Sequence, residues 1–204
     1  MESNQANNSI GVISPQYCTP YQVDLYFAKK VKNITEGRHL GVFGIDGNHI
    51  FRSSCRISKA CEISPHQRWK AHNGDSSDSK DLLFTIKKSK YLQLKIELDV
   101  FLASNTTENV CDFKIKQNYS EKSCVIYRGD SDNIIAEVHK NKISRDKIRG
   151  KDRFSATVYP DVDYAFVIAM RAVLNEINTL SRAGGGSGGT VVEVCGGDGC
   201  GGGG

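Results

Sequence analysis

The chain has 204 residues, 39% of them hydrophobic and 25% charged, and its formal net charge is +4. This length and balance predict one globular domain that can bury a core of its own without disulfide staples. The mild basic excess favours weak attraction to phosphate-bearing surfaces, but it does not demand a nucleic-acid partner.

The sequence shows no targeting segment and no membrane span. Residues 1–9 are polar and lack the apolar stretch of a secretory signal, and the best apolar run, residues 164–170, stops at Arg171. A spanning helix needs roughly 20 apolar residues. We therefore expect a protein that is not secreted, has no transmembrane span and stays in the cytoplasm or nucleus. Its seven cysteines are then expected as free thiols.

The chain divides into three parts. Residues 1–14 are polar and predict a flexible N-terminal arm, whereas residues 15–183 carry the periodic pattern of a folded domain. Residues 184–204 are mostly glycine, interrupted chiefly at residues 190–195. Glycine loses more conformational freedom on ordering than any other residue, so this tail is predicted to be disordered.

Short alternating strands dominate the predicted domain. Residues 91–98 alternate apolar and polar side chains over eight positions, and Asp46-Gly47 and Arg128-Gly129-Asp130 are turn signals between strands. Regular short strands of this kind favour a sandwich or a barrel. The predicted strands cover residues 21–27, 42–45, 48–51, 82–87, 91–98, 112–116, 123–127, 134–138 and 154–159.

One segment near the end of the domain predicts a helix instead. After Pro160, either Asp161 or Asp163 can cap a helix over about residues 162–182. The first half of this helix is hydrophobic all round rather than striped, so it is expected inside a core. Such a rod suits the middle of a β-barrel, where it leaves no room for a small ligand in the lumen.

Several stretches follow one another in a recognisable order from about Pro15 to Leu180. They include Tyr17–Pro20, Gln67–Trp69, Leu98–Leu102, Gly150–Phe154 and Val158–Phe166. This order resembles the LURP-one-related family of plant proteins, which belongs with the tubby-like and phospholipid-scramblase-like proteins. The resemblance implies a mainly β (α+β) fold, a tubby C-terminal-like β-barrel of antiparallel strands around a central hydrophobic C-terminal helix.

One stretch departs from the pattern of that family. Between the Asp46-Gly47 turn and Trp69, family members carry a further turn and an apolar strand, whereas here Phe51 leads through residues 52–56 almost directly to Pro65. The short segment over residues 52–66 leaves open whether a strand or hairpin of the barrel is missing. A missing strand would leave an unpaired edge, which is a liability in a sheet.

The sequence contains no catalytic or metal-binding signature. The five histidines lie outside any nucleophile or zinc pattern, and Cys55 and Cys61 are farther apart than structural zinc ligands usually are. The glycine run at residues 184–189 lacks the lysine of a phosphate loop. We therefore expect a non-enzymatic protein without metal or cofactor.

The best candidate for a functional feature is a basic segment between two predicted strands. Because tubby-like domains are associated with phosphoinositide headgroups, the resemblance implies contact with anionic phospholipid at the periphery of the plasma membrane. Each basic residue near such a surface contributes about 1 kcal/mol. The alternative is a solvated turn. The segment contains only two acidic residues, Asp146 and Asp152. Its seven basic residues are Lys140, Lys142, Arg145, Lys147, Arg149, Lys151 and Arg153.

Other functions stay open at this point. The domain could dock to a protein partner in plant defence or stress signalling. It could handle lipid as a scramblase-like protein, or be a degenerate family member with a purely structural or interaction role. Nucleic acid is not expected, because the basic segment lacks interleaved aromatic side chains for base stacking. Cys195 and Cys200 in the tail are candidates for reversible acylation or are inert thiols.

Overall fold

Eleven strands, two short 3-10 turns and one long helix make up the computed structural model, which describes residues 10–29, 40–44, 49–52, 55–59, 68–73, 78–89, 96–118, 123–140 and 151–182. The strands are β1 (Val23–Lys29), β2 (Leu40–Phe43), β3 (His49–Arg52), β4 (Cys55–Lys59), β5 (Arg68–Asn73), β6 (Leu82–Lys88), β7 (Ile96–Leu102), β8 (Phe113–Asn118), β9 (Ser123–Arg128), β10 (Ile134–Lys140) and β11 (Lys151–Val158). The 3-10 turns are η1 (Pro15–Tyr17) and η2 (Ser79–Asp81), and the helix is α1 (Tyr164–Arg182).

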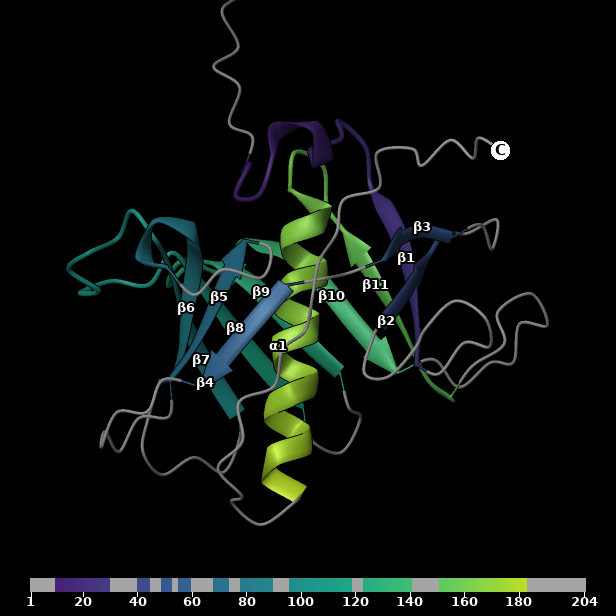
Figure 1. The fold of residues 1–204 in the computed structure, drawn as a ribbon. Coiled ribbons are helices and arrows are strands. Elements are labelled where there is room, and N and C mark those ends of the chain that lie inside the picture. The colour runs from purple at the N-terminus through teal and green to yellow at the C-terminus, as the bar shows by residue number, and fades with distance from the viewer. Residues whose placement is uncertain are drawn as a thin grey trace, which may run out of the picture.

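All strands belong to one antiparallel sheet with the order β3-β2-β1-β11-β10-β9-β8-β7-β6-β5-β4. Most neighbours in the sheet are also neighbours in the chain, and the exception is β1, which pairs with β2 on one side and with β11 on the other. The sheet curves around α1 (Figure 1). The expected antiparallel sheet with a C-terminal helix is therefore confirmed.

Closure of that sheet into a barrel is not confirmed. The two edge strands are β3 and β4, which follow each other in the chain but share no ladder within the described ranges. The break falls within residues 52–66, the segment that was singled out as short from the sequence. Among the described residues, β3 pairs only with β2 and β4 pairs only with β5.

Helix α1 is the centre of the core. The ring of Phe166 lies 5.2 Å from the ring of Phe84 and 4.9 Å from that of Phe113, each measured between centroids. Aromatic pairs in such edge-on and tilted arrangements are worth about 0.5–1.5 kcal/mol beyond the area that they bury. Over residues 165–174 the helix is buried on every side, as the sequence predicts for its first half. The buried residues of the helix are Ala165, Phe166, Val167, Ile168, Ala169, Met170, Arg171, Ala172, Val173, Leu174 and Ile177.

Asp163 joins the start of α1 to the N-terminal segment. Its fully buried carboxylate accepts the backbone N–H of Phe166 at 3.0 Å through Oδ1, which is an N-cap bond. Its Oδ2 accepts three more backbone N–H groups, from Val12 at 3.1 Å, Ile13 at 2.7 Å and Ser14 at 3.0 Å. A buried carboxylate with four donors is well satisfied, and it lies at the helix end where a negative charge is favourable.

This contact corrects one expected boundary. The predicted flexible arm covers residues 1–14, but residues 10–14 are bound to the helix start, and Ile10 also donates its N–H to the carbonyl of Asp161 at 2.8 Å. The sequence could not reveal this because the partners are about 150 positions away. The other expected boundaries, at residues 183 and 184, stay predictions.

The strand predictions hold for most of the chain, with three differences. The alternating pattern did not indicate β5, and Gln67–Trp69 was noted only as one of the stretches that resemble the family. Strand β4 was not predicted, because Ile57 is the only large aliphatic residue in its five positions. The strand expected at residues 91–98 is described only from Ile96, and β7 continues to Leu102 because Leu98, Val100 and Phe101 are all buried. The predicted Arg128-Gly129-Asp130 turn is present, with Gly129 at a φ of 59°, a conformation that glycine adopts without strain.

Candidate functional site

The pleat of the sheet sorts its side chains into two faces. Trp69, Ile86, Val100 and Phe113 pair across β5, β6, β7 and β8, and all four are buried against the core. Successive residues of a strand point to opposite faces, so the paired residues next to them lie on the outer face. These outer residues form a charged row across the four strands, made of Arg68, Lys87, Asp99 and Lys114.

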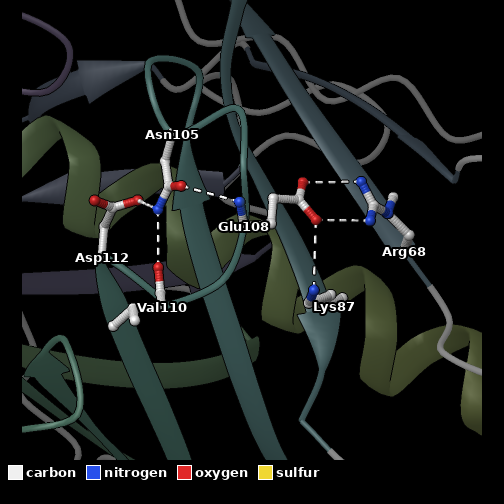
Figure 2. Close-up of polar contacts among 6 residues, drawn as sticks. All are labelled: Arg68, Lys87, Asn105, Glu108, Val110 and Asp112. Carbon is white, nitrogen blue, oxygen red and sulfur yellow. Dashed lines mark hydrogen bonds and ion pairs between the residues drawn. The ribbon is translucent and has the colours of Figure 1, made fainter.

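A carboxylate from the β7–β8 loop binds the first two cations of this row (Figure 2). The guanidinium of Arg68 donates to both oxygens of Glu108, from Nη1 at 2.9 Å and from Nη2 at 2.8 Å. The ammonium of Lys87 lies 3.4 Å from the same carboxylate. The Arg68–Glu108 contact is therefore a two-pronged, charge-assisted pair, which is the strongest geometry that a surface ion pair adopts.

The loop that carries Glu108 is held by its own polar contacts. The amide of Asn105 accepts the N–H of Glu108 at 3.1 Å and donates to the carbonyl of Val110 and to the carboxylate of Asp112, each at 2.9 Å (Figure 2). Asp112 also accepts the N–H of Leu102 at 2.9 Å. Asn105 and Asp112 thus fix both ends of the loop against the sheet.

Between this loop and the charged row lies a groove of about 480 Å³. That volume is within the range of sites that take small ligands or short peptide segments. Its charged lining is close to balanced, with four basic and three acidic residues: Arg68, Lys87, Lys88, Lys114, Asp99, Glu108 and Asp130.

The other end of the charged row has an ion pair of its own. Lys114 donates to Asp130 and lies 3.9 Å from Asp99. The hydrogen bond with Asp130 raises the pKa of Lys114, and the same bond lowers the pKa of Asp130. Burial, helped by Asp99, raises the pKa of the Cys111 thiol in the groove wall, so this sulfur stays protonated at neutral pH and is not an activated nucleophile.

The basic segment predicted from the sequence lies elsewhere, at the end of the sheet where β10 stops and β11 begins. Lys140 is the last residue of β10, and Lys151 and Arg153 belong to β11. The ladder pairs Lys151 with Lys29 of β1, so the backbone brings a further lysine to this end. The remaining four predicted residues, Lys142, Arg145, Lys147 and Arg149, lie outside the described residues. A binding role for all seven stays a prediction.

Other polar groups form smaller clusters. On the outer face, Glu137 accepts the hydroxyl of Tyr159 at 3.0 Å, and its other oxygen lies 3.2 Å from Nε2 of His139. Inside the core, the guanidinium of Arg171 lies 3.8 Å from the centre of the Phe154 ring. Over the ranges that the structure covers, histidine, cysteine and acidic residues nowhere gather in threes as a metal site requires. In those ranges no helix is both long and apolar enough to cross a membrane.

The Arg68–Glu108–Lys87 contact was not found from the sequence. Lys87 ends a predicted strand, so its outward orientation follows from the buried Ile86 beside it, whereas no strand was predicted around Arg68. Glu108 comes from a loop, and its reach depends on a left-handed backbone with a φ of 49° that no periodic pattern indicates for glutamate. The Arg68–Glu108 contact therefore becomes visible only once the conformation of the loop is known.

Comparison with known proteins places the chain in a family. A family model described as LURP-one-related matches residues 21–175. Protein LURP-one-related 15 from Arabidopsis thaliana is 38% identical over 191 residues, which cover 84% of this chain and 88% of that protein. Protein LURP-one-related 10, also from Arabidopsis thaliana, is 36% identical over 189 residues, or 83% of this chain and 97% of that protein.

A solved structure agrees with these matches. An X-ray structure of a protein from Arabidopsis thaliana superimposes with a TM-score of 0.56 at 31% identity, over 82% of this chain and 98% of that chain. The match extends over the sheet and helix together, and the resemblance inferred from the sequence is confirmed. The chain belongs to the LURP-one-related family.

Proposed function

We propose that this protein is a non-enzymatic, tubby-like binding module that docks onto phosphoinositide-bearing membranes through the basic connection between β10 and β11. The observation that carries the proposal is the concentration of charge at one end of the sheet. Seven basic residues stand against two acidic ones over residues 140–153, and the ladder adds Lys29 beside Lys151. The resemblance to tubby-like domains supports the same ligand, and it implies a peripheral location at the cytoplasmic side of the plasma membrane.

The geometry of the rest of the domain favours this end as the docking face. The opposite end is covered by residues 10–18, which are bonded to Asp163 and to the start of α1. Strand β11 begins at the end of the sheet where α1 finishes (Figure 1). The described N-terminal segment therefore lies at the end of the domain away from the basic connection.

Vesicle binding tests this proposal directly. Changing Lys142, Arg145, Lys147 and Arg149 together to serine removes about 4 kcal/mol of attraction to an anionic surface, which corresponds to a roughly thousandfold weaker affinity. Co-sedimentation is measured with phosphatidylcholine vesicles that contain or lack phosphatidylinositol bisphosphate. Binding by the unchanged protein should also fade toward about 1 M salt, where charges are screened over about 3 Å.

A matched variant separates the position of the charge from its amount. Changing Lys70, Lys80, Lys116 and Arg128 to serine lowers the formal net charge from +4 to zero, as the first variant does, but leaves the basic end intact. This control should keep most of its vesicle binding. If both variants bind alike, or if the unchanged protein ignores anionic vesicles at low salt, membrane docking is wrong.

A second candidate function, docking to a signalling protein in plant defence or stress, is favoured by the groove beside Glu108. The groove is large enough for a short peptide segment, and its wall carries an arginine whose two-pronged geometry suits a carboxylate. This function does not depend on the basic end. The quadruple variant at residues 142–149 should therefore leave it unchanged.

A further inference from the structure

We propose that Arg68 and Lys87 form a binding site for a carboxylate of a partner peptide, and that Glu108 occupies this site until such a peptide displaces it. This inference deepens the second candidate function, because it names the chemistry that the groove recognises. It rests on the protein being a binding module and is independent of membrane contact.

The cationic half of the site is built into the sheet. Arg68 and Lys87 are directly paired residues of β5 and β6, which are flanked by further strands on both sides. Their side chains are only 24% and 25% exposed. Because the ladder fixes both backbones, the two side chains leave the sheet at neighbouring positions whether or not Glu108 is present. An arginine fork held in this way is pre-organised for a carboxylate.

Glu108 is the movable half. It belongs to a loop, and its φ of 49° lies in the left-handed region, which residues other than glycine rarely adopt. Its side chain is still 20% exposed, at the wall of the groove. The loop carries this strain through its own contacts, so the Glu108 side chain, unlike the two cations, is not held by a strand ladder and can be exchanged.

The loop does not need the Glu108 carboxylate to stay folded. Asn105 bonds to the carbonyl of Val110 and to Asp112, and the N–H of Asp112 donates to the carbonyl of Val100 at 2.9 Å. None of these contacts uses the Glu108 side chain. A competing carboxylate can therefore take the place of Glu108 without unfolding the loop.

The groove lining defines the kind of peptide that fits. The two cations hold one carboxylate, that of Glu108, so a single carboxylate is favoured at this position. Val110, which is 66% exposed at the rim, offers an apolar contact beside it. We therefore expect a segment with one acidic residue flanked by apolar side chains.

The test uses a fluorescein-labelled hexapeptide with one central glutamate between two leucines. The same peptide with glutamine or with phosphoserine at the centre serves for comparison, and binding to the full chain is followed by fluorescence anisotropy. Glu108→Gln removes the competing charge while keeping the size of the side chain. It should bind the glutamate peptide about tenfold more tightly than the unchanged protein, as loss of about 1.4 kcal/mol of competing attraction implies.

Two further variants make the result specific. Asp132→Asn removes the same charge from an exposed position that does not line the groove, and it should bind like the unchanged protein. Arg68→Lys keeps the charge but lacks the fork, leaves the loop untouched and should weaken binding of the glutamate peptide. Equal affinities for Glu108→Gln and Asp132→Asn would overturn the proposal. A gain that is equally large with the glutamine peptide, or one confined to the phosphoserine peptide, would overturn the carboxylate assignment.

Discussion

Replacing Asp163 by asparagine should destabilise the fold far more than the same change two residues earlier. The carboxylate is fully buried and accepts N–H groups from Val12, Ile13, Ser14 and Phe166. Asparagine has one acceptor oxygen in place of two, and its NH₂ group must face at least one of these donors. The less costly orientation turns the oxygen toward residues 12–14 and leaves the N–H of Phe166 without its cap.

The size of the effect follows from these four bonds. Loss of an N-cap costs about 1 kcal/mol, and three charge-assisted bonds that become neutral lose roughly 1 kcal/mol each. Part of this is offset because the uncharged amide is cheaper to bury, so the expected loss in the free energy of unfolding is about 2–4 kcal/mol. For a domain of this length the corresponding fall in Tm is roughly 5–15 °C.

Asp161→Asn is the matched control for this prediction. Asp161 is exposed and has a φ of 62°, a conformation that asparagine also tolerates, so its Tm should hardly change. The assay is thermal and urea unfolding followed by circular dichroism, together with hydrogen exchange at Val12, Ile13 and Ser14, which should quicken in Asp163→Asn alone. Stability within about 0.5 kcal/mol of the unchanged protein would refute the role assigned to Asp163.

Three further results are expected. Ala169→Arg should abolish soluble expression, because Ala169 is fully buried in α1 and an unpaired buried charge costs several kcal/mol; a normally folded variant would contradict the central position of the helix. Burial raises the pKa of the Cys124 thiol to about 11, so Cys124 should resist alkylation in the native state. Between about pH 9 and 11 only the unfolded chain forms the thiolate, so the free energy of unfolding should fall over this range, and Cys124→Ala should weaken that dependence. Deleting residues 184–204 should leave the Tm nearly unchanged, and a drop of many degrees would mean that residues 191–194 dock on the domain.

Local patterns were enough to predict most of the fold. The all-round apolar run of α1, the turn at Gly129 and the alternation in β9 and β10 each depend on residues close together in the chain. Asp163 was also among the residues expected to cap the helix. What these elements share is that their geometry follows from neighbours within a few positions.

Contacts between distant segments were beyond the reach of such patterns. The three bonds from residues 12–14 to Asp163 join segments about 150 positions apart. The charged groove depends on the register of β5 with β6 and on a strained residue at Glu108. The sequence also left open whether the short segment over residues 52–66 supplies a further strand, which decides whether the sheet closes between β3 and β4. Each is decided by tertiary packing, which overrides local preference.

The pairing of β1 with β11 also sets the order in which this protein can fold during its synthesis. Hydrogen-bonded side chains on these two strands, Asp24 and Thr157, are 133 positions apart, and α1 is made after both. Until the ribosome releases residues 164–182, the apolar inner face of the sheet has no helix to pack on. Long-range pairing of this kind is slow, and exposed strands aggregate readily. The apolar inner faces of the nascent strands therefore stay without their partner until α1 has been synthesised.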